Sequence, residues 1–385
     1  MNRSIGWFAL FLAAGCGQQD IEAERAAPPR FELMGQAEIL AASPGVTDEP
    51  EVIDSHKLDP AKASGDDGSD ALMVTADGRL FRERAPALRR RSDVPIDANP
   101  GGFAPGAAER AGARAQNPGD PEGADALRAN GGEQNIAPTA FWLQGVDLPD
   151  QRFPFTSTTY PARAAVAFTG TGSCSGVFVG PRHVLTAAHC IYTIGAGWSL
   201  PSNVVPAQQG SGTAPPYGTI SVTNGIVPNG YVNATTTEDK VKFDYAMIVT
   251  ADSSFSVGWF GFSGSYEDTL IDGRGYPVPQ APCYNAPVSG SGGWDAPWGR
   301  CDGYQYWQPS NMSQYEEFWG YSWLDGQPGQ SGMPWYRSNI VYLVHKGADV
   351  ATHRTIAKRL TSSSASTICD WIGDFPSAYF DHDCY

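Results

Sequence analysis

Apolar and β-branched residues gather in short runs bounded by Gly, Pro and Ser clusters from about Val146 onward. Each run has the length and composition of a β-strand, and the 3.6-residue periodicity of an amphipathic helix is scarce. This pattern predicts an all-β domain over residues 146–385, built as an antiparallel sandwich or barrel. The clearest predicted strands are Ala164 to Phe168, Gly176 to Val179, Tyr245 to Thr250 and Ile340 to Val344.

One segment near the C-terminus departs from this pattern. The run SSASTICDWIGDF places Ile368, Trp371 and Ile372 at helical spacing, so that they share one face. Ser364 precedes them and belongs to a residue type that favours the N-cap position. We therefore expect a short C-terminal helix capped by Ser364.

The region from residue 17 to about 145 has a different composition, rich in Ala, Gly, Pro and charged residues and poor in aromatics. Such a stretch cannot build a large core, and we expect it to be poorly structured. A small hairpin from Ala71 to Glu83, with its turn at Asp77 and Gly78, is the exception. Two interpretations remain: a pro-region removed by a cut near Gln144 to Val146, or a flexible linker or stalk.

Residues 1–16 have the composition of an export signal. Arg3 precedes an apolar stretch from Ile5 to Ala14, which is too short to span a membrane and ends in small residues before Cys16. Small residues directly before a Cys resemble a bacterial lipoprotein signal, in which a lipid on Cys16 would anchor the protein to a membrane. A conventional signal cleaved near these small residues is the alternative, and both predict an extracellular or cell-envelope location.

Length and charge narrow the possible functions. A chain of 385 residues exceeds the usual size of one domain, so more than one structural unit is expected. The formal charge of −15 argues against nucleic-acid binding, which needs clustered Lys and Arg. No apolar run reaches the roughly 18 residues that a spanning helix needs, and we expect a monomer.

The cysteine content fits an exported protein, because six cysteines remain when Cys16 is set aside. They permit three disulfides, and about fifteen connectivities are open in principle. The six fall into neighbouring pairs separated by 16, 18 and 15 residues, so pairing in sequence order is the simplest prediction. The predicted pairs are Cys174 with Cys190, Cys283 with Cys301, and Cys369 with Cys384.

The segment from Cys174 to Cys190 carries the strongest signal of chemistry. It contains two predicted strands joined by a Gly-Pro turn and ends in LTAAHC, where His189 lies beside a cysteine. A disulfide between the two ends would close this hairpin and hold the His189 ring at a strand end, where it could reach a cleft. His183 and His353 lack this setting, and we expect them to be structural or exposed.

Two further segments contain groups that could act with His189. Asp244 is the one charge in the apolar run from Phe243 to Val249, and a buried carboxylate needs partners, either turn N–H groups or an imidazole that it orients. Ser331 lies in the glycine-rich loop LDGQPGQSGMPWY, which can aim the N–H groups of Gly329 and Ser331 at one point. Two converging N–H groups would form an oxyanion hole.

The order His189, Asp244, Ser331, with gaps of 55 and 87 residues, resembles the trypsin and chymotrypsin superfamily of serine endopeptidases. LTAAHC is the most specific motif. The bacterial glutamyl endopeptidase branch is the most similar, because it shares Gln or Asn before the nucleophile, a Gly-Tyr-Pro segment and a His in the stretch matched by VYLVHKG. The resemblance implies two antiparallel β-barrels, a His-Asp-Ser triad that cleaves protein or peptide substrates through an acyl-enzyme, and no metal or cofactor.

Two departures from the superfamily bear on activation and specificity. Gln330 stands where animal members have the Asp that receives the new N-terminus, so activation must work differently. His345 matches the carboxylate-binding His of glutamyl endopeptidases and predicts cleavage after Glu, but Gly326 stands where those enzymes have a hydroxyl group. Asp325 indicates the alternative, a serine protease of basic specificity that cleaves after Lys or Arg, because such enzymes have an acidic residue at this position.

Two rival functions keep the same fold. A catalytically inert, protease-like binding lipoprotein would usually have lost the His or the Ser, and both are present here. An acyl hydrolase acting on esters is compatible with triad chemistry, but the trypsin-like order of the residues disfavours it.

Overall fold

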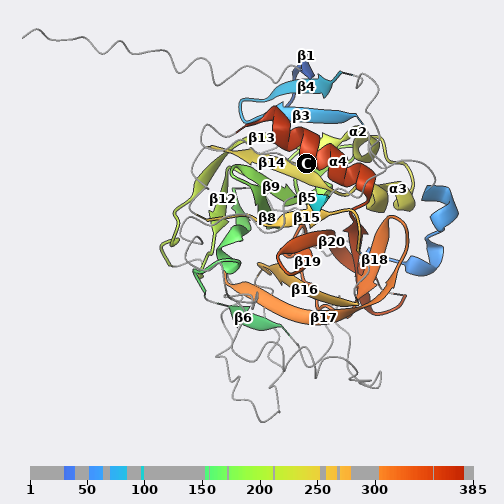
Figure 1. Cartoon of the computed structure of the whole chain (residues 1–385). Coiled ribbons are helices and arrows are strands. Elements are labelled where there is room, and N and C mark those ends of the chain that lie inside the picture. The colour runs from blue at the N-terminus through green and yellow to red at the C-terminus, as the bar shows by residue number, and fades with distance from the viewer. Residues whose placement is uncertain are drawn as a thin grey trace, which may run out of the picture.

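The computed structural model of the chain describes residues 30–39, 52–63, 70–84, 97–98, 152–155, 157–170, 173–210, 213–251, 257–266, 269–278, 303–349 and 351–376. Two antiparallel β-barrels form its centre (Figure 1). In this part of the chain no helix is both long and apolar enough to cross a membrane. Several predicted features lie outside the described residues: Cys16, Cys283, Cys301, Cys384 and the junction at Gln144 to Val146.

The first barrel is a closed ring of six strands. They pair antiparallel in the order β13, β12, β7, β8, β9 and β14, and β14 pairs back with β13. The strands are β7 (Ala165–Thr169), β8 (Ser175–Gly180), β9 (His183–Thr186), β12 (Asn203–Pro206), β13 (Ile220–Pro228) and β14 (Ala246–Thr250).

The second barrel closes in the same way. Its strands pair antiparallel in the order β19, β16, β17, β18, β21 and β20, and β20 pairs back with β19. They are β16 (Leu270–Gly275), β17 (Gln305–Tyr315), β18 (Trp319–Ser322), β19 (Pro334–Arg337), β20 (Ile340–Asp349) and β21 (Arg354–Arg359). The predicted all-β architecture of two trypsin-like barrels is therefore confirmed.

The remaining elements are short and connect or flank the barrels. Helix α3 leads directly into the segment that carries Asp244. The short elements are β5 (Asp97–Ala98), β6 (Phe153–Phe155), β10 (Tyr192–Thr193), β11 (Gly197–Trp198), β15 (Gly261–Ser263), α2 (Asn229–Val232), α3 (Thr237–Lys242), η6 (Ala162–Ala164) and η7 (Ala188–Cys190).

The predicted strand from Ile340 to Val344 is longer than expected. Strand β20 runs on to Asp349 and contains a β-bulge: His345 faces Ala357 and Gly347 faces Ile356, which leaves Lys346 as the extra residue. A bulge of this kind bends the strand and redirects the side chain of the extra residue.

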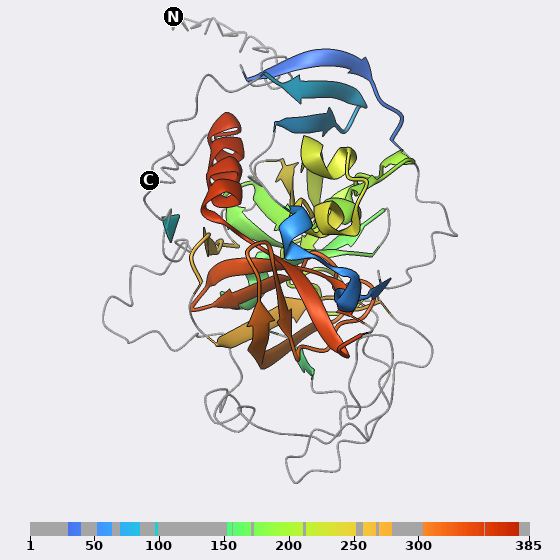
Figure 2. The same ribbon diagram turned by 90° about the vertical axis from the view of Figure 1, so that its right-hand side faces the viewer.

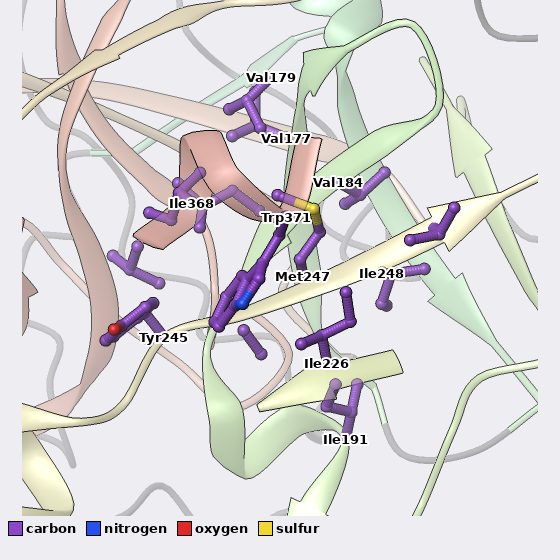
Figure 3. Close-up of a cluster of buried hydrophobic side chains, with 14 of the residues drawn as sticks. Val177, Val179, Val184, Ile191, Ile226, Tyr245, Met247, Ile248, Ile368 and Trp371 are labelled. Carbon is purple, nitrogen blue, oxygen red and sulfur yellow. The ribbon is translucent and has the colours of Figure 1, made fainter. Parts of the chain in front are cut away.

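The C-terminal helix α4 (Ser362–Asp374) covers the first barrel (Figures 1 and 3). Trp371 is fully buried and stacks on Tyr245, with ring centroids 5.6 Å apart. The expected cap is wrong in detail, because Thr361 is the N-cap and Ser364 is its partner three residues later. The Thr361 hydroxyl accepts from Ser364 N at 3.2 Å and the Ser364 hydroxyl accepts from Thr361 N at 2.8 Å, which forms a capping box.

The predicted hairpin near the N-terminus is confirmed and is part of a larger structure. Strands β3 (Ala71–Thr75) and β4 (Arg79–Glu83) pair around a turn in which Gly78 has φ +86°. Strand β1 (Phe31–Gln36) pairs with β4, and β3 pairs with β13 beyond the end of β12. Within the region expected to be poorly structured, these three strands thus extend the sheet of the first barrel (Figure 1).

A second N-terminal segment lies against the other barrel (Figure 2). Strand β2 (Val52–Ile53) pairs parallel with β20 at Ala348 and Asp349. Two 3-10 turns follow, η2 (Ser55–Lys57) and η3 (Pro60–Ala63). Ile53 and Ala63 are buried in one cluster with Trp319 and Ile356.

We predict that the N-terminal strands contribute measurably to stability. Met73 on β3 is fully buried in the core of the first barrel, so Met73→Ala should lower the free energy of unfolding by about 2–5 kcal/mol. Leu33→Ala on β1 is the control, because this side chain is 62% exposed and its loss should change stability by no more than about 0.5 kcal/mol. Chemical denaturation measures both, and equal effects would show that β3 is not part of the barrel core.

Candidate active site

His189 is held at the end of β9 by covalent and local structure. The strand ends at Thr186, and the 3-10 turn η7 then carries His189 between Ala188 and Cys190. The predicted disulfide between Cys174 and Cys190 is present and ties this turn to the start of β8. The imidazole therefore projects from a turn that is fixed at both ends.

Asp244 orients the His189 ring through two hydrogen bonds. Its Oδ1 accepts from the backbone N of His189 at 3.0 Å, and its Oδ2 lies 2.8 Å from the ring Nδ1. The carboxylate is fully buried, whereas the His189 side chain is 19% exposed. The other ring nitrogen, Nε2, is buried and has no hydrogen-bond partner among the described residues.

Lys346 also bonds to the Asp244 carboxylate. Its Nζ lies 2.8 Å from Oδ2, and neither side chain is exposed to solvent. Burial would raise the pKa of Asp244, but the charges of His189 and Lys346 and their hydrogen bonds outweigh burial and hold that pKa below its ordinary range. Asp244 is therefore an ionised acceptor shared by groups from both barrels.

Ser331 reaches this cluster from the second barrel. Its hydroxyl donates a long hydrogen bond of 3.5 Å to the backbone carbonyl of Lys346. The next residue, Gly332, has φ +80°, and a Cβ there would lie 2.1 Å from Thr186 Oγ1 and 3.0 Å from Ala187 N. Only glycine allows this approach, which brings the Ser331 loop against the strand end that carries His189.

Ser175 binds the Ser331 loop through two of its carbonyl groups. Its backbone N donates to Ser331 O at 2.8 Å, and its hydroxyl donates to Gly329 O at 2.7 Å. The same hydroxyl accepts from Tyr276 N at 2.8 Å, which fixes its direction. With these carbonyls engaged, the N–H groups of Gly329 and Ser331 have no acceptor within the described structure, as an oxyanion hole requires.

Gln330 is held by a buried arginine. Arg152 donates from Nη1 to Gln330 Oε1 at 2.7 Å and from Nη2 to Gln327 Oε1 at 2.8 Å. Gln330 Oε1 also accepts from Gln327 N at 3.0 Å. Gln330 thus accepts a hydrogen bond from a guanidinium group of the same chain. Arg152 therefore holds the loop before Ser331 at both Gln327 and Gln330.

The three residues predicted to set specificity lie together beside this loop. His345 is 2% exposed, and its Nδ1 is buried without a hydrogen-bond partner. A Cβ on Gly326 would lie 2.7 Å from Cε1 and 2.8 Å from Nε2 of His345, so the glycine packs directly on the ring. Asp325 is also buried, and its backbone N donates to Gln308 Oε1 at 2.7 Å.

The setting of His345 disfavours the charged form of its imidazole. Burial lowers the pKa of His345 to about 3, and the charges of His189 and Arg152 add to this against the opposing effect of Asp244. The ring is therefore neutral at neutral pH. It can donate one hydrogen bond to a bound group, but it supplies no positive charge.

Sequence reasoning missed three residues of the site: Ser175, Arg152 and Lys346. Lys346 shows the same signal that identified Asp244, a charge inside an apolar strand run. The partners of Arg152 and Ser175 in the Ser331 loop lie more than 150 residues away in sequence, so no local pattern indicates them. His183 is buried in β9 and His353 is exposed after β20.

The arrangement does not fit a metal site. Among the described residues, the ligand atoms of Cys174, His189 and Cys190 lie within 4.8 Å of one another. The two sulfur atoms are joined in the disulfide, and metal binding by cysteine requires free thiolates. His189 Nδ1 is engaged by Asp244.

Known proteins resemble part of the chain in sequence. Residues 151–267 match the family model described as Trypsin. Glutamyl endopeptidase of Bacillus licheniformis is 33% identical over 151 residues, 38% of this chain and 46% of that protein. Extracellular metalloprotease of Bacillus subtilis is 31% identical over 143 residues, 35% of this chain and 44% of that protein. The chain thus spans less than half the length of the curated relatives that it matches.

Solved structures resemble the chain more distantly. A Glu endopeptidase in complex with MPD has a TM-score of 0.47 and 21% identity, and covers 57% of this chain and 94% of its own. A thermostable serine protease, AL20, has a TM-score of 0.41 and 14% identity, and covers 55% of this chain and 97% of its own. The fold assignment therefore rests on the strand pairing. The match of residues 151–267 to the Trypsin family model agrees with the two closed barrels.

Proposed function

We propose that the protein is a serine endopeptidase with the triad His189, Asp244 and Ser331. The observation that carries this proposal is the state of the His189 ring: Nδ1 is bonded to the buried, ionised Asp244, and Nε2 has no hydrogen-bond partner among the described residues. A ring oriented in this way can act as a general base and then as a general acid.

In the first step Ser331 Oγ attacks the carbonyl carbon of a peptide bond while His189 Nε2 takes the hydroxyl proton. The new C–O bond converts the carbonyl to a tetrahedral oxyanion. The C–N bond then breaks, and His189 returns the proton to the leaving amine. The product of this step is an acyl-enzyme on Ser331, with His189 neutral again.

In the second step a water molecule replaces the amine. His189 takes one proton from the water, the oxygen attacks the ester carbon, and the proton is delivered to Ser331 Oγ as the ester bond breaks. The N–H groups of Gly329 and Ser331 would bind the oxyanion in both steps. One such donor stabilises the transition state by about 3–4 kcal/mol. The Ser175 hydrogen bonds shape the loop that carries these donors, so they affect the reaction rate.

We propose cleavage after Glu, with His345 as the hydrogen-bond donor in the pocket. A buried ring nitrogen without a partner is costly, and a bound carboxylate would supply the missing acceptor. The positive charge of Arg152 acts on His345 and favours the binding of an anionic substrate side chain there. Asp325, buried nearby, is the observation that favours the alternative of basic specificity.

We propose that residues 17–145 are a pro-region that covers the substrate site. Strand β19 pairs with β20 only as far as Val344, and beyond it the edge of β20 passes Ser331 at Lys346. A peptide substrate could add to such an edge as a further strand. Strand β2 occupies this edge at Ala348 and Asp349, and Ser55 N bonds to Asp349 Oδ1 at 2.8 Å.

The proposed location of the protein rests on the first 16 residues of the chain. We propose that residues 1–16 direct export, to the extracellular space or the cell envelope, and that Cys16 carries a lipid if the signal is of the lipoprotein type. The relative from Bacillus subtilis is named as extracellular, which agrees with export. The partners would be protein or peptide substrates.

The triad is tested by substitution. Ser331→Ala and His189→Ala should each lower kcat about a millionfold, and Asp244→Asn about ten-thousandfold, because the members of a triad act as one unit. Hydrolysis of a peptide substrate measures the rates, and circular dichroism checks that each variant is folded. Wild-type turnover by a pure Ser331→Ala protein would refute the serine mechanism, whereas a folded wild-type protein without any turnover would favour the inert, protease-like function.

The specificity is tested with a peptide library at several pH values. Cleavage after Glu should dominate and should not weaken between about pH 5 and about pH 8, because His345 with its lowered pKa of about 3 is already neutral throughout this range. His345→Ala should lose the preference, and Asp325→Asn is the comparison variant. Dominant cleavage after Lys or Arg, or an unchanged Glu preference in His345→Ala, would contradict the assignment.

The pro-region is tested with Ile53→Asp in the uncut chain. Ile53 is buried with Phe318 and Trp319, and an unpaired carboxylate there costs several kcal/mol, so β2 should leave β20 and kcat/KM should rise. Lys57→Ala, whose side chain is 82% exposed, is the control and should not change the rate. Mass spectrometry confirms that the chain is uncut. Equal activity of the two variants would show that β2 does not restrict access.

A further inference from the structure

Lys346 is the one residue of the described site that contacts both Asp244 and Ser331. Its Nζ lies 2.8 Å from Asp244 Oδ2, and its backbone carbonyl accepts from Ser331 Oγ at 3.5 Å. It is the extra residue of the bulge in β20, between His345 and Gly347. The bulge interrupts the alternation of side chains along β20, because Lys346 lies outside the register with β21. Its side chain reaches the Asp244 carboxylate.

The ammonium competes with His189 for one oxygen atom. Asp244 Oδ2 accepts from both Lys346 Nζ and His189 Nδ1, each at 2.8 Å. At full burial the interaction between charges is weakly screened. With Lys346 present, the carboxylate and the ammonium together are neutral, so the carboxylate stabilises a positive charge on His189 less than an isolated Asp would.

The other charged groups around His189 act in the same direction or are neutral. His345 precedes Lys346 on β20, and its lowered pKa of about 3 leaves it uncharged in the working range. Arg152 carries a positive charge that reaches His345 and therefore does not favour a charged His189. Asp244 is the group that favours protonation of His189, and Lys346 is bonded to it.

We propose that Lys346 is a positioning residue of the triad, which holds the Asp244 carboxylate in place and keeps His189 unprotonated, and thus active as a base, at lower pH. The inference rests on the proposed peptidase function. It adds a charged residue from the second barrel to the His-Asp pair of the first.

The pH profile of kcat/KM tests the inference, because its acid limb reports the protonation of the free enzyme's base. In Lys346→Met the midpoint of the acid limb should move to higher pH by about one unit. Lys346→Gln removes the charge but keeps a donor and should shift the limb in the same direction. Lys346→Arg keeps the charge and should leave the limb close to that of the wild type.

Lys358→Met is the matched control, because Lys358 is equally buried but donates to Arg359 O and not to Asp244. It should leave the midpoint unchanged even if it lowers stability. If Lys346→Met does not fold, Lys346→Gln decides the question. An unmoved acid limb in an active charge-removed variant would overturn the role of Lys346 and leave the peptidase function intact, whereas activity in Ser331→Ala would refute the peptidase itself.

Discussion

The Asp244 carboxylate has no contact with solvent, and the rest of the site compensates for that burial. An ionised carboxylate in the interior costs several kcal/mol unless donors surround it. The donors here are the backbone and ring of His189 on one side and the ammonium of Lys346 on the other. Since His189 belongs to the first barrel and Lys346 to the second, one buried charge constrains how the barrels meet. That contact also brings the Lys346 carbonyl to Ser331 Oγ.

A second constraint between the barrels is steric. Gly332 packs so closely on Thr186 and Ala187 that no side chain fits. The carbonyls on either side of Gln330 are taken by Ser175, from the strand that begins beside the disulfide. The Ser331 loop is therefore shaped from the first barrel, although it belongs to the second. His189 and the Ser331 loop are thus both held by the hairpin of β8 and β9.

The N-terminal strands use edges that the barrels leave open. Strand β3 pairs with the part of β13 that extends beyond β12. Strand β2 pairs with the part of β20 that extends beyond β19. The first contact buries Met73 and Phe81 in the barrel core, so it stabilises the fold. The second buries Ile53 against Trp319 and Ile356 of the second barrel. One region of low hydrophobic content thus contacts both barrels through separate short segments.

The sequence by itself determined the strands, the hairpin around Gly78 and the disulfide next to His189, because each depends on local patterning. Local patterning predicted the helix N-cap at Ser364, about one turn after its actual position at Thr361. Both residue types favour N-caps, so the sequence alone does not distinguish them. Only the tertiary structure decided the partner of Lys346 and the neutral state of His345. Both depend on burial and on charges brought from distant strands, and solvation by neighbours far away in the chain leaves no mark on local sequence.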